Sequence, residues 1–134
     1  MATTTTQRYI GAIGRRKTAT ASVRITPGTS SFTVNDKDVK AYFKTSELVR
    51  VAMESLNKAT DTPDYTVTAV VSGGGIHSQA EAIRHGIARA LTEAHDHVKT
   101  DLKKAGFLKR DPRAKERRKF GFRKARKRAQ WSKR

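Results

Sequence analysis

Apolar and polar residues alternate near the start of the chain, in the stretch KTATASVRIT at residues 17–26. Its alanines, valine and isoleucine fall on one side and most of its hydroxyl residues on the other, which predicts a strand with one buried face. Pro27 and Gly28 supply turn chemistry, and SFTVN (31–35) resembles a returning strand. We therefore expect a hairpin of these two strands, preceded by a weak edge strand in RYIGAIGR (8–15).

Helical periodicity follows this β-rich part. Residues 38–43 predict a short helical turn, and SELVRVAMESLNKA (46–59) predicts a longer helix with one apolar stripe and Ser46 as its cap. YTVTAVV (65–71) is rich in β-branched residues and predicts a strand. The glycines that follow lead into the most amphipathic segment, 79–94, and a last short helix should end at Gly106. The expected order of the main elements is β-β-β-α-β-α.

Apolar periodicity ends at Leu108. Residues 111–134 contain only six apolar residues, three of them alanine. Fixing each backbone there costs about 1–2 kcal/mol, and no core could offset that cost. We expect a flexible N-terminus (1–7), a compact domain (8–108) and a basic C-terminal tail (109–134) that is disordered when free.

The charge of the chain is distributed very unevenly. The formal net charge is +17, yet residues 99–134 hold 17 basic and 3 acidic residues, a net +14, which leaves only +3 for the rest. Such asymmetry is typical of proteins that bind nucleic acid or an anionic surface. The chain has no cysteine, no apolar run near the roughly 18 residues of a membrane span, and no secretory signal pattern at its start. We expect a cytoplasmic protein without a membrane partner.

Two glycine-containing motifs are candidates for phosphate contact. GRRKTA (14–19) places three cations beside a glycine at the start of a strand, so it is either a phosphate contact or a solvated strand end. VSGGGIHSQAEAIRHGIARAL (71–91) runs from strand through glycines to helix, as phosphate-binding loops do. It lacks both nucleotide-binding signatures. Close approach to an RNA phosphate and plain tight packing both remain open.

The histidines do not indicate a metal site or an enzyme. His77, His85, His95 and His97 have no companion cysteine or carboxylate set at ligand spacing. No grouping of serine, histidine and aspartate indicates a nucleophile. We expect no catalytic residue, metal, cofactor or small-molecule substrate. His85 follows Arg84 near the polar face of its helix, which suits a phosphate or base contact.

Aromatic residues interrupt the cations of the basic region. Phe107, Phe120, Phe122 and Trp131 stand between lysines and arginines, and aromatic rings in such a setting stack on unpaired bases. A purely electrostatic partner would not require them. They favour RNA.

Several blocks together resemble the bacterial ribosomal protein S-nine family, from about Tyr9 to Arg134. The blocks are GRRKTATASVRI, GGGIHSQAEAIRHGIARAL, KKAGFLKRDPRAKERRKFG, KAR and the terminal SKR, in the family's order and spacing. The chain departs from the family's pattern at Ser78, where glycine is common, and at Trp131, where phenylalanine or tyrosine is usual.

The resemblance implies an α+β fold, with a mixed four-stranded sheet, helices on one face and a left-handed βαβ crossover, followed by the long basic extended tail. It implies a structural constituent of the small ribosomal subunit that takes part in translation, bound to small-subunit ribosomal RNA in the head beside neighbouring head proteins. The tail would run toward the peptidyl site, where Ser132, Lys133 and Arg134 would approach the anticodon stem-loop of transfer RNA. The residues expected to bind ribosomal RNA are Arg15, Arg16, Lys17, Gly73, Gly74, Gly75, Arg84, His85, Arg110, Arg113, Arg117, Arg118, Lys119, Arg123, Lys124, Arg126, Lys127 and Arg128.

Three alternatives belong to other classes. The protein subunit of an RNA-processing ribozyme shares the fold and basicity, but EAIRHGIARAL (81–91) lacks that family's Arg-Asn-Arg signature. A DNA-architectural protein would need dimer contacts or minor-groove wedges, which nothing in the sequence requires. A kinase of this fold would need a phosphate loop with a catalytic aspartate or lysine, which is absent.

Overall fold

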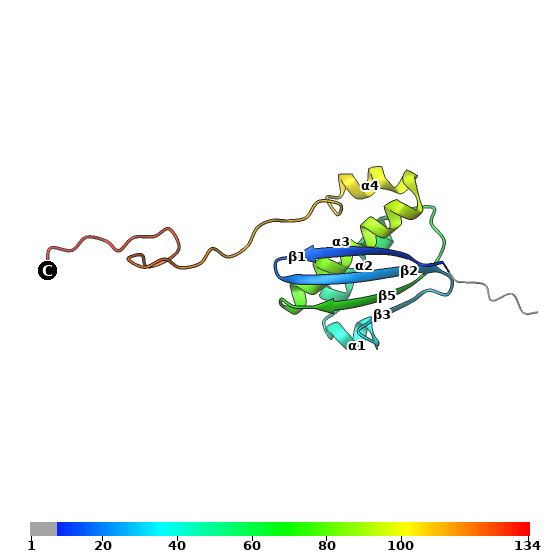
Figure 1. Ribbon diagram of the computed structural model, residues 1–134, viewed down its shortest axis with the longest axis horizontal. Helices are drawn as coiled ribbons and strands as arrows, with labels where there is room; N and C mark the ends of the chain where they lie inside the picture. Colours follow the sequence, from blue (N-terminus) through cyan, green and yellow to red (C-terminus); the bar gives the residue numbers. More distant parts are fainter. Residues whose placement is uncertain (1–7) are drawn as a thin grey trace, which may run out of the picture.

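The computed structural model describes residues 8–134, and the flexible N-terminus predicted for residues 1–7 lies outside the described residues. A mixed five-stranded sheet forms one layer, and two helices pack on one of its faces as the other layer (Figure 1). The strands are β1 (Ile10–Arg16), β2 (Ala19–Pro27), β3 (Ser31–Val34), β4 (Lys37–Asp38) and β5 (Tyr65–Ser72). The helices are α1 (Val39–Phe43), α2 (Ser46–Lys58), α3 (Ile76–Ala94) and α4 (Lys99–Lys104), with a 3-10 turn at Asp96–Val98.

The predicted hairpin of β2 and β3 is wrong. The strand order is β1-β2-β5-β3-β4, so β5 lies between them, antiparallel to β2 and parallel to β3. The segment after Pro27 passes over the start of β5, where the Gly28 N–H donates to the Asp64 carbonyl at 3.1 Å. Local turn chemistry therefore bends the chain without closing a hairpin, and β5 takes the position beside β2 that a hairpin would have given to β3.

The sheet has five strands rather than the predicted four. The additional strand β4 has two residues and pairs with β3, and it is too short to produce an alternating pattern. Asn35 and Asp36 form the connecting turn with φ of 48° and 63°. These residue types are the ones that tolerate the left-handed region in two-residue hairpins. The Asn35-Asp36 dipeptide is therefore the only local sequence feature that indicates a turn into β4.

Most helices start and end near the predicted positions. The cap predicted at Ser46 is wrong, since Thr45 occupies the N-cap of α2 and makes no side-chain capping bond. Helix α3 begins at Ile76, three residues earlier than its apolar pattern indicated. Gly106 follows α4 with φ of 80°, as expected for a glycine that ends a helix. The parallel strands β3 and β5 are joined through β4, α1 and α2, so a βαβ crossover is present, and its left-handed sense stays a prediction.

The core lies between the sheet and α3, and close packing of two glycines sets the distance between them. Ala21, Val23 and Ile25 of β2 are fully buried. Gly14 of β1 lies directly on α3, where an added Cβ would overlap the Ala82 carbonyl oxygen and the Gly86 amide. This contact places the cations that follow Gly14 beside the polar side of α3.

Candidate nucleic-acid interface

The two glycine-containing motifs meet at one end of the sheet. Gly73 and Gly74, with φ of 73° and 64°, pack on the turn between β1 and β2, where added Cβ atoms would lie 2.7 Å from the Thr18 carbonyl oxygen and 3.0 Å from Ala19. Tight packing therefore accounts for these two glycines. Gly75 has nothing within 4 Å of an added Cβ, so its backbone is open to an outside group.

His85 joins this turn to α3. Its Nδ1 accepts the backbone N–H of Arg15 at 3.3 Å, which requires an unprotonated nitrogen there. Burial lowers the pKa of His85 below its ordinary value, and the nearby Arg89 guanidinium lowers it further. The Arg15 side chain remains exposed. The neutral ring thus holds the backbone of Arg15 and leaves its guanidinium outward.

Arg84 has protein partners on two sides. Its Nη1 donates to Glu54 Oε2 of α2 at 2.6 Å, and its guanidinium carbon lies 4.9 Å from the centre of the Phe107 ring. Only 26% of its side chain is exposed. Arg84 therefore connects α2, α3 and the residues after α4, and its Nη1 is engaged by Glu54.

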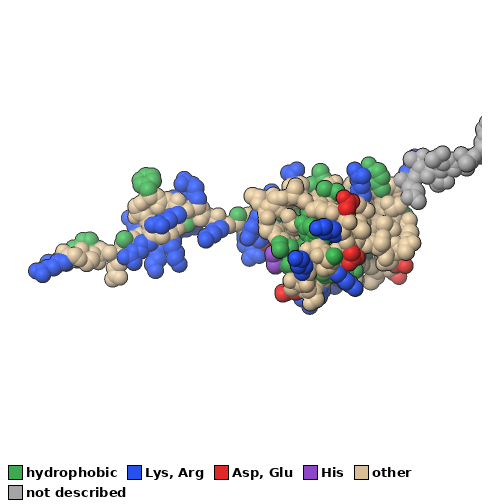
Figure 2. Space-filling view, turned by 90° about the horizontal axis from the view of Figure 1, so that it is seen from below, with side chains coloured by type: hydrophobic (Ala, Val, Ile, Leu, Met, Phe, Trp, Pro, Cys, Tyr) green, Lys and Arg blue, Asp and Glu red, His purple; other side chains and the backbone are tan. Residues whose placement is uncertain are grey.

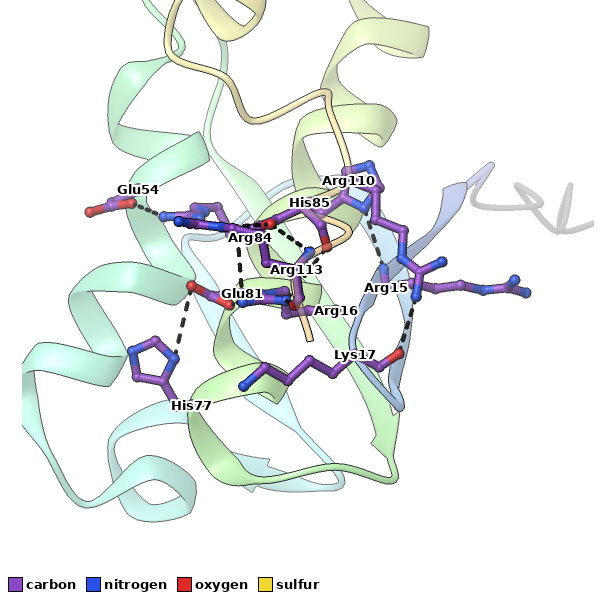
Figure 3. Close-up of polar contacts among 11 residues, drawn as sticks. Arg15, Arg16, Lys17, Glu54, His77, Glu81, Arg84, His85, Arg110 and Arg113 are labelled. Atoms are coloured by element: carbon purple, nitrogen blue, oxygen red, sulfur yellow. Dashed lines mark hydrogen bonds and ion pairs between the residues drawn. The ribbon is translucent and has the colours of Figure 1, made fainter. Parts of the chain in front are cut away.

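Arg16 is also engaged within the protein. Its Nε donates to Glu81 Oε2 of α3 at 2.6 Å, and its Nη1 donates to the Arg113 carbonyl at 2.5 Å (Figure 3). Only 13% of the Arg16 side chain is exposed, whereas the adjacent residues Arg15 and Lys17 are exposed. The three cations of GRRKTA, predicted as one group, are thus in two different environments.

The tail leaves the domain over a shallow hollow between this turn and α3. Arg110 Nη2 donates to the Lys17 carbonyl at 3.1 Å. Asp111 accepts hydrogen bonds from Arg113, and these bonds hold the pKa of Asp111 well below its ordinary value. Half of the residues around the hollow are lysine or arginine, and two are acidic: Arg15, Arg16, Glu81, Arg84, His85, Gly106, Phe107, Lys109, Arg110 and Asp111.

Beyond Arg113 the tail extends away from the domain with no helix or regular strand (Figure 1). Glu116 accepts hydrogen bonds from Lys119 at 2.6 Å and Arg126 at 2.8 Å, which draws together residues ten apart. A turn containing Gly121, with φ of 76°, and a single bridge between Phe122 and Arg128 lie within the same stretch. Lysine and arginine side chains project all along the tail (Figure 2). Its exposed cations among the predicted residues are Arg117, Arg118, Arg123, Lys124, Arg126, Lys127 and Arg128.

The four aromatic residues of the basic region do not share one environment. Phe107 packs against the core, and Phe122 is covered by Arg128, whose guanidinium carbon lies 5.3 Å from the ring centre. Phe120 is 99% exposed and Trp131 is 82% exposed. Only these last two have open faces on which a base could stack.

The last three residues lie at the far end of the tail. Ser132, Lys133 and Arg134 are exposed, and Ser132 Oγ donates to a main-chain carboxylate oxygen of Arg134 at 2.7 Å. No helix in residues 8–134 has both the length and the apolar character to cross a membrane. Within that part of the chain, no cluster of three or more histidine, aspartate or glutamate side chains could hold a metal ion.

Sequence reasoning missed the acidic partners of the predicted cations. Asp111 stands two residues before Arg113, and Glu116 three before Lys119, so those pairs were visible as local spacing. Arg16 and Glu81 are 65 residues apart, and Arg84 and Glu54 are 30 apart. Only the packing of β1 and α2 against α3 brings those groups together, and no local pattern indicates it.

One comparison with known protein families bears on this interface. Residues 14–134 match the family described as Ribosomal protein S9/S16. The matched region contains the β1–β2 turn, α3 and the entire tail, and therefore every residue predicted to bind RNA.

Proposed function

The chain belongs to the ribosomal protein S9/S16 family, a family of structural, non-enzymatic proteins of the small ribosomal subunit. We propose that its compact domain and its tail bind different parts of that subunit. The compact domain docks on ribosomal RNA in the head of the subunit, beside neighbouring head proteins. The tail runs between RNA helices toward the peptidyl site, and its last three residues reach the anticodon stem-loop of the bound transfer RNA.

The observation that carries this proposal is the difference in how charge is balanced along the chain. Residues 114–134 hold eleven lysines and arginines and one acidic residue, Glu116. Glu116 already has two cationic partners, Lys119 and Arg126. The other cations need counter-charges from outside the protein, and the phosphates of RNA supply them in a closely spaced row.

Exposed groups on the domain extend the same surface. Arg15 and Lys17 lie beside the base of the tail, and the open backbone at Gly75 lies at the start of α3, where peptide N–H groups point outward. Arg16 and Arg84, which the sequence also favoured, have internal partners. On the domain, the proposed interface therefore rests mainly on Arg15, Lys17 and Gly75.

The salt dependence of binding tests the proposal. The full chain would be titrated with in-vitro-transcribed RNA of the small-subunit head at several salt concentrations. With about eight tail cations on phosphates, log K should fall with log salt at a slope of roughly −5 to −7, using about 0.7–0.9 per contact. A slope near −2 would contradict phosphate binding by the tail.

Location in the cell and in the subunit would be checked separately. A tagged chain should sediment with small ribosomal subunits, and cross-links on assembled subunits should run from head RNA near Arg15 to transfer RNA near Arg134. Sedimentation with another ribonucleoprotein or with the nucleoid would overturn the proposal.

A further inference from the structure

We propose that Arg16 is an internal clasp for the tail rather than an RNA contact. Together with Glu81 it holds residues 110–113 against the domain and so fixes the direction in which the tail leaves. This inference rests on the proposed RNA binding. Arg16 and Glu81 are then positioning residues: they orient the tail, and the other cations bind the RNA.

Each nitrogen of the Arg16 guanidinium lies within 3.6 Å of a protein oxygen. Nε donates to Glu81 Oε2 at 2.6 Å, Nη1 donates to the Arg113 carbonyl at 2.5 Å and lies 3.5 Å from the Asp111 carbonyl, and Nη2 lies 3.6 Å from Asp111 Oδ2. A guanidinium that bound phosphate would need donors directed outward. Those of Arg16 are directed inward, and 87% of its side chain is shielded from solvent.

Other contacts close the same unit. Arg110 Nη2 donates to the Lys17 carbonyl at 3.1 Å, next to Arg16 in sequence. Asp111 accepts from the Arg113 backbone N–H at 3.0 Å and from its side chain at 2.9–3.2 Å. Segments more than 90 residues apart in sequence are therefore joined by several hydrogen bonds, and the joined segment ends at Arg113.

Holding the base of a tail changes what its binding costs. A tail that pivots at residue 109 samples many directions, and most of them lead away from the RNA path. If the pivot moves to residue 114, the cations that follow start near their binding positions, and less freedom is lost on binding. The clasp thus raises RNA affinity without touching RNA.

Replacing Glu81 separates this mechanism from simple electrostatics, because the two predict opposite signs. Glu81→Ala removes a negative charge close to the proposed RNA surface, so electrostatics alone predicts tighter binding. The clasp predicts weaker binding, by about three- to tenfold for the lost preorganisation. Glu93→Ala is the matched control, because Glu93 is an exposed acid on the same helix that makes no hydrogen bond or ion pair with Arg16 or the tail in residues 8–134. It should bind head RNA as tightly as the parent chain or slightly more tightly.

Replacing Arg16 gives a second, independent readout. If Arg16 bound a phosphate, Arg16→Gln would lower the log–log salt slope by about 0.7–0.9. The clasp predicts an unchanged slope with weaker affinity at every salt concentration. Arg15→Gln, at the exposed neighbouring position, should lower the magnitude of the log–log salt slope by about 0.7–0.9, the amount expected for one phosphate contact.

Order in the free protein is measured without RNA. In the full chain, backbone ¹⁵N order parameters should stay at folded-domain values through Arg113 and fall after it, whereas Glu81→Ala and Arg16→Gln should lower them from about residue 109. If the parent chain binds no head RNA, the proposed function fails whatever these order parameters show. If it binds, the clasp is refuted by a Glu81→Ala chain that binds as tightly as Glu93→Ala with residues 110–113 equally ordered.

Discussion

Two arginines of the compact domain are paired with carboxylates of the protein itself, whereas most arginines of the tail are not. Arg16 and Arg84 each have a carboxylate partner at 2.6 Å, and both are largely shielded from solvent. After Arg113, eleven cations share the single acid Glu116. The same side chain therefore serves as an internal connector in one region and as an available ligand for phosphate in the other. Composition alone does not separate these roles, but the presence of a nearby acid does.

The two regions also differ in what their apolar residues accomplish. The domain has a continuous core in which β2, β5 and α3 bury their alternating and helical apolar faces. The tail has aromatic rings with no core to enter, and Phe120 is almost fully exposed. Burial stabilises the domain, whereas exposure leaves the rings of Phe120 and Trp131 free for a partner.

Deleting residues 114–134 should have the largest effect, and it should act on RNA binding and not on stability. Eleven closely spaced cations of the 29 lysines and arginines are lost, so affinity for head RNA at low salt should fall on the order of a thousandfold or more. The unfolding free energy should not change, because the core lies entirely before residue 109. Filter binding and chemical denaturation would measure the two quantities. A parallel loss of stability would mean that the tail supports the domain.

The opposite result is expected for Gly14→Ala. The new methyl group would overlap backbone atoms of α3, at Ala82 and Gly86, so neither side can yield by a change of rotamer. We expect a loss of about 3 kcal/mol in unfolding free energy, at the upper end for overpacking. Gly75→Ala is the control, because its site is open and its φ is −96°. It should lower stability by about 1 kcal/mol or less, because Gly75 is the N-cap of α3 and glycine is preferred over alanine there, and an equal loss in both variants would contradict the packing argument.

The sequence predicted the elements better than their pairing. Alternation in β2 and the β-branched run of β5 identified both strands, because burial on one face leaves a pattern of period two. The pairing of β5 between β2 and β3 depends on contacts more than 30 residues apart, so local turn chemistry at Pro27 and Gly28 predicted the wrong hairpin. Strand β4 has too few residues for any period.

Prediction of the candidate interface was likewise limited, because contacts between residues far apart in the sequence leave no local pattern. The charge of the tail is a property of composition and needs no fold, so the sequence identified it directly. Which cations are free depends on partners that the fold supplies, as for Arg16 and Glu81. The glycines were visible, but only the structure separates Gly73 and Gly74, which pack on the β1–β2 turn, from Gly75, which does not.

Phe107 in the domain and Phe120 in the tail allow the two regions to be compared with the same side chain. Phe107 packs on the core beneath Arg84, so Phe107→Ala should lower the unfolding free energy by roughly 2 kcal/mol, with part of the loss due to the cation–π contact. Phe120→Ala should leave stability unchanged and weaken RNA binding by about 1–3 kcal/mol if the ring stacks on a base. Denaturation and RNA titration of both variants would test this. Equal RNA affinity for the parent chain and Phe120→Ala would exclude stacking at that position.

The smallest expected effect is at the tip, where only Ser132, Lys133 and Arg134 are removed. Incorporation into subunits should barely change, because nine of the eleven cations beyond Arg113 remain. The tip matters because of its position. The bridge between Phe122 and Arg128 folds the chain back, so only the residues after Arg128 extend freely from the rest of the tail. Six extended residues span about 20 Å, enough to carry Arg134 beyond the rest of the protein.

A phosphate contact by Arg134 is charge-assisted and worth on the order of 1.5–3 kcal/mol before the tip is ordered. Ordering the chain end offsets part of that gain, so truncation should lower transfer RNA affinity only a few-fold to tenfold. The loss should be largest where codon pairing is weak, because the tip then supplies a larger share of the binding. Arg134→Lys should retain part of the effect, since it keeps the charge and loses the planar fork. Dissociation of transfer RNA from programmed small subunits at physiological salt is the measurement, and unchanged off-rates with normal incorporation would exclude a role for the tip in holding transfer RNA.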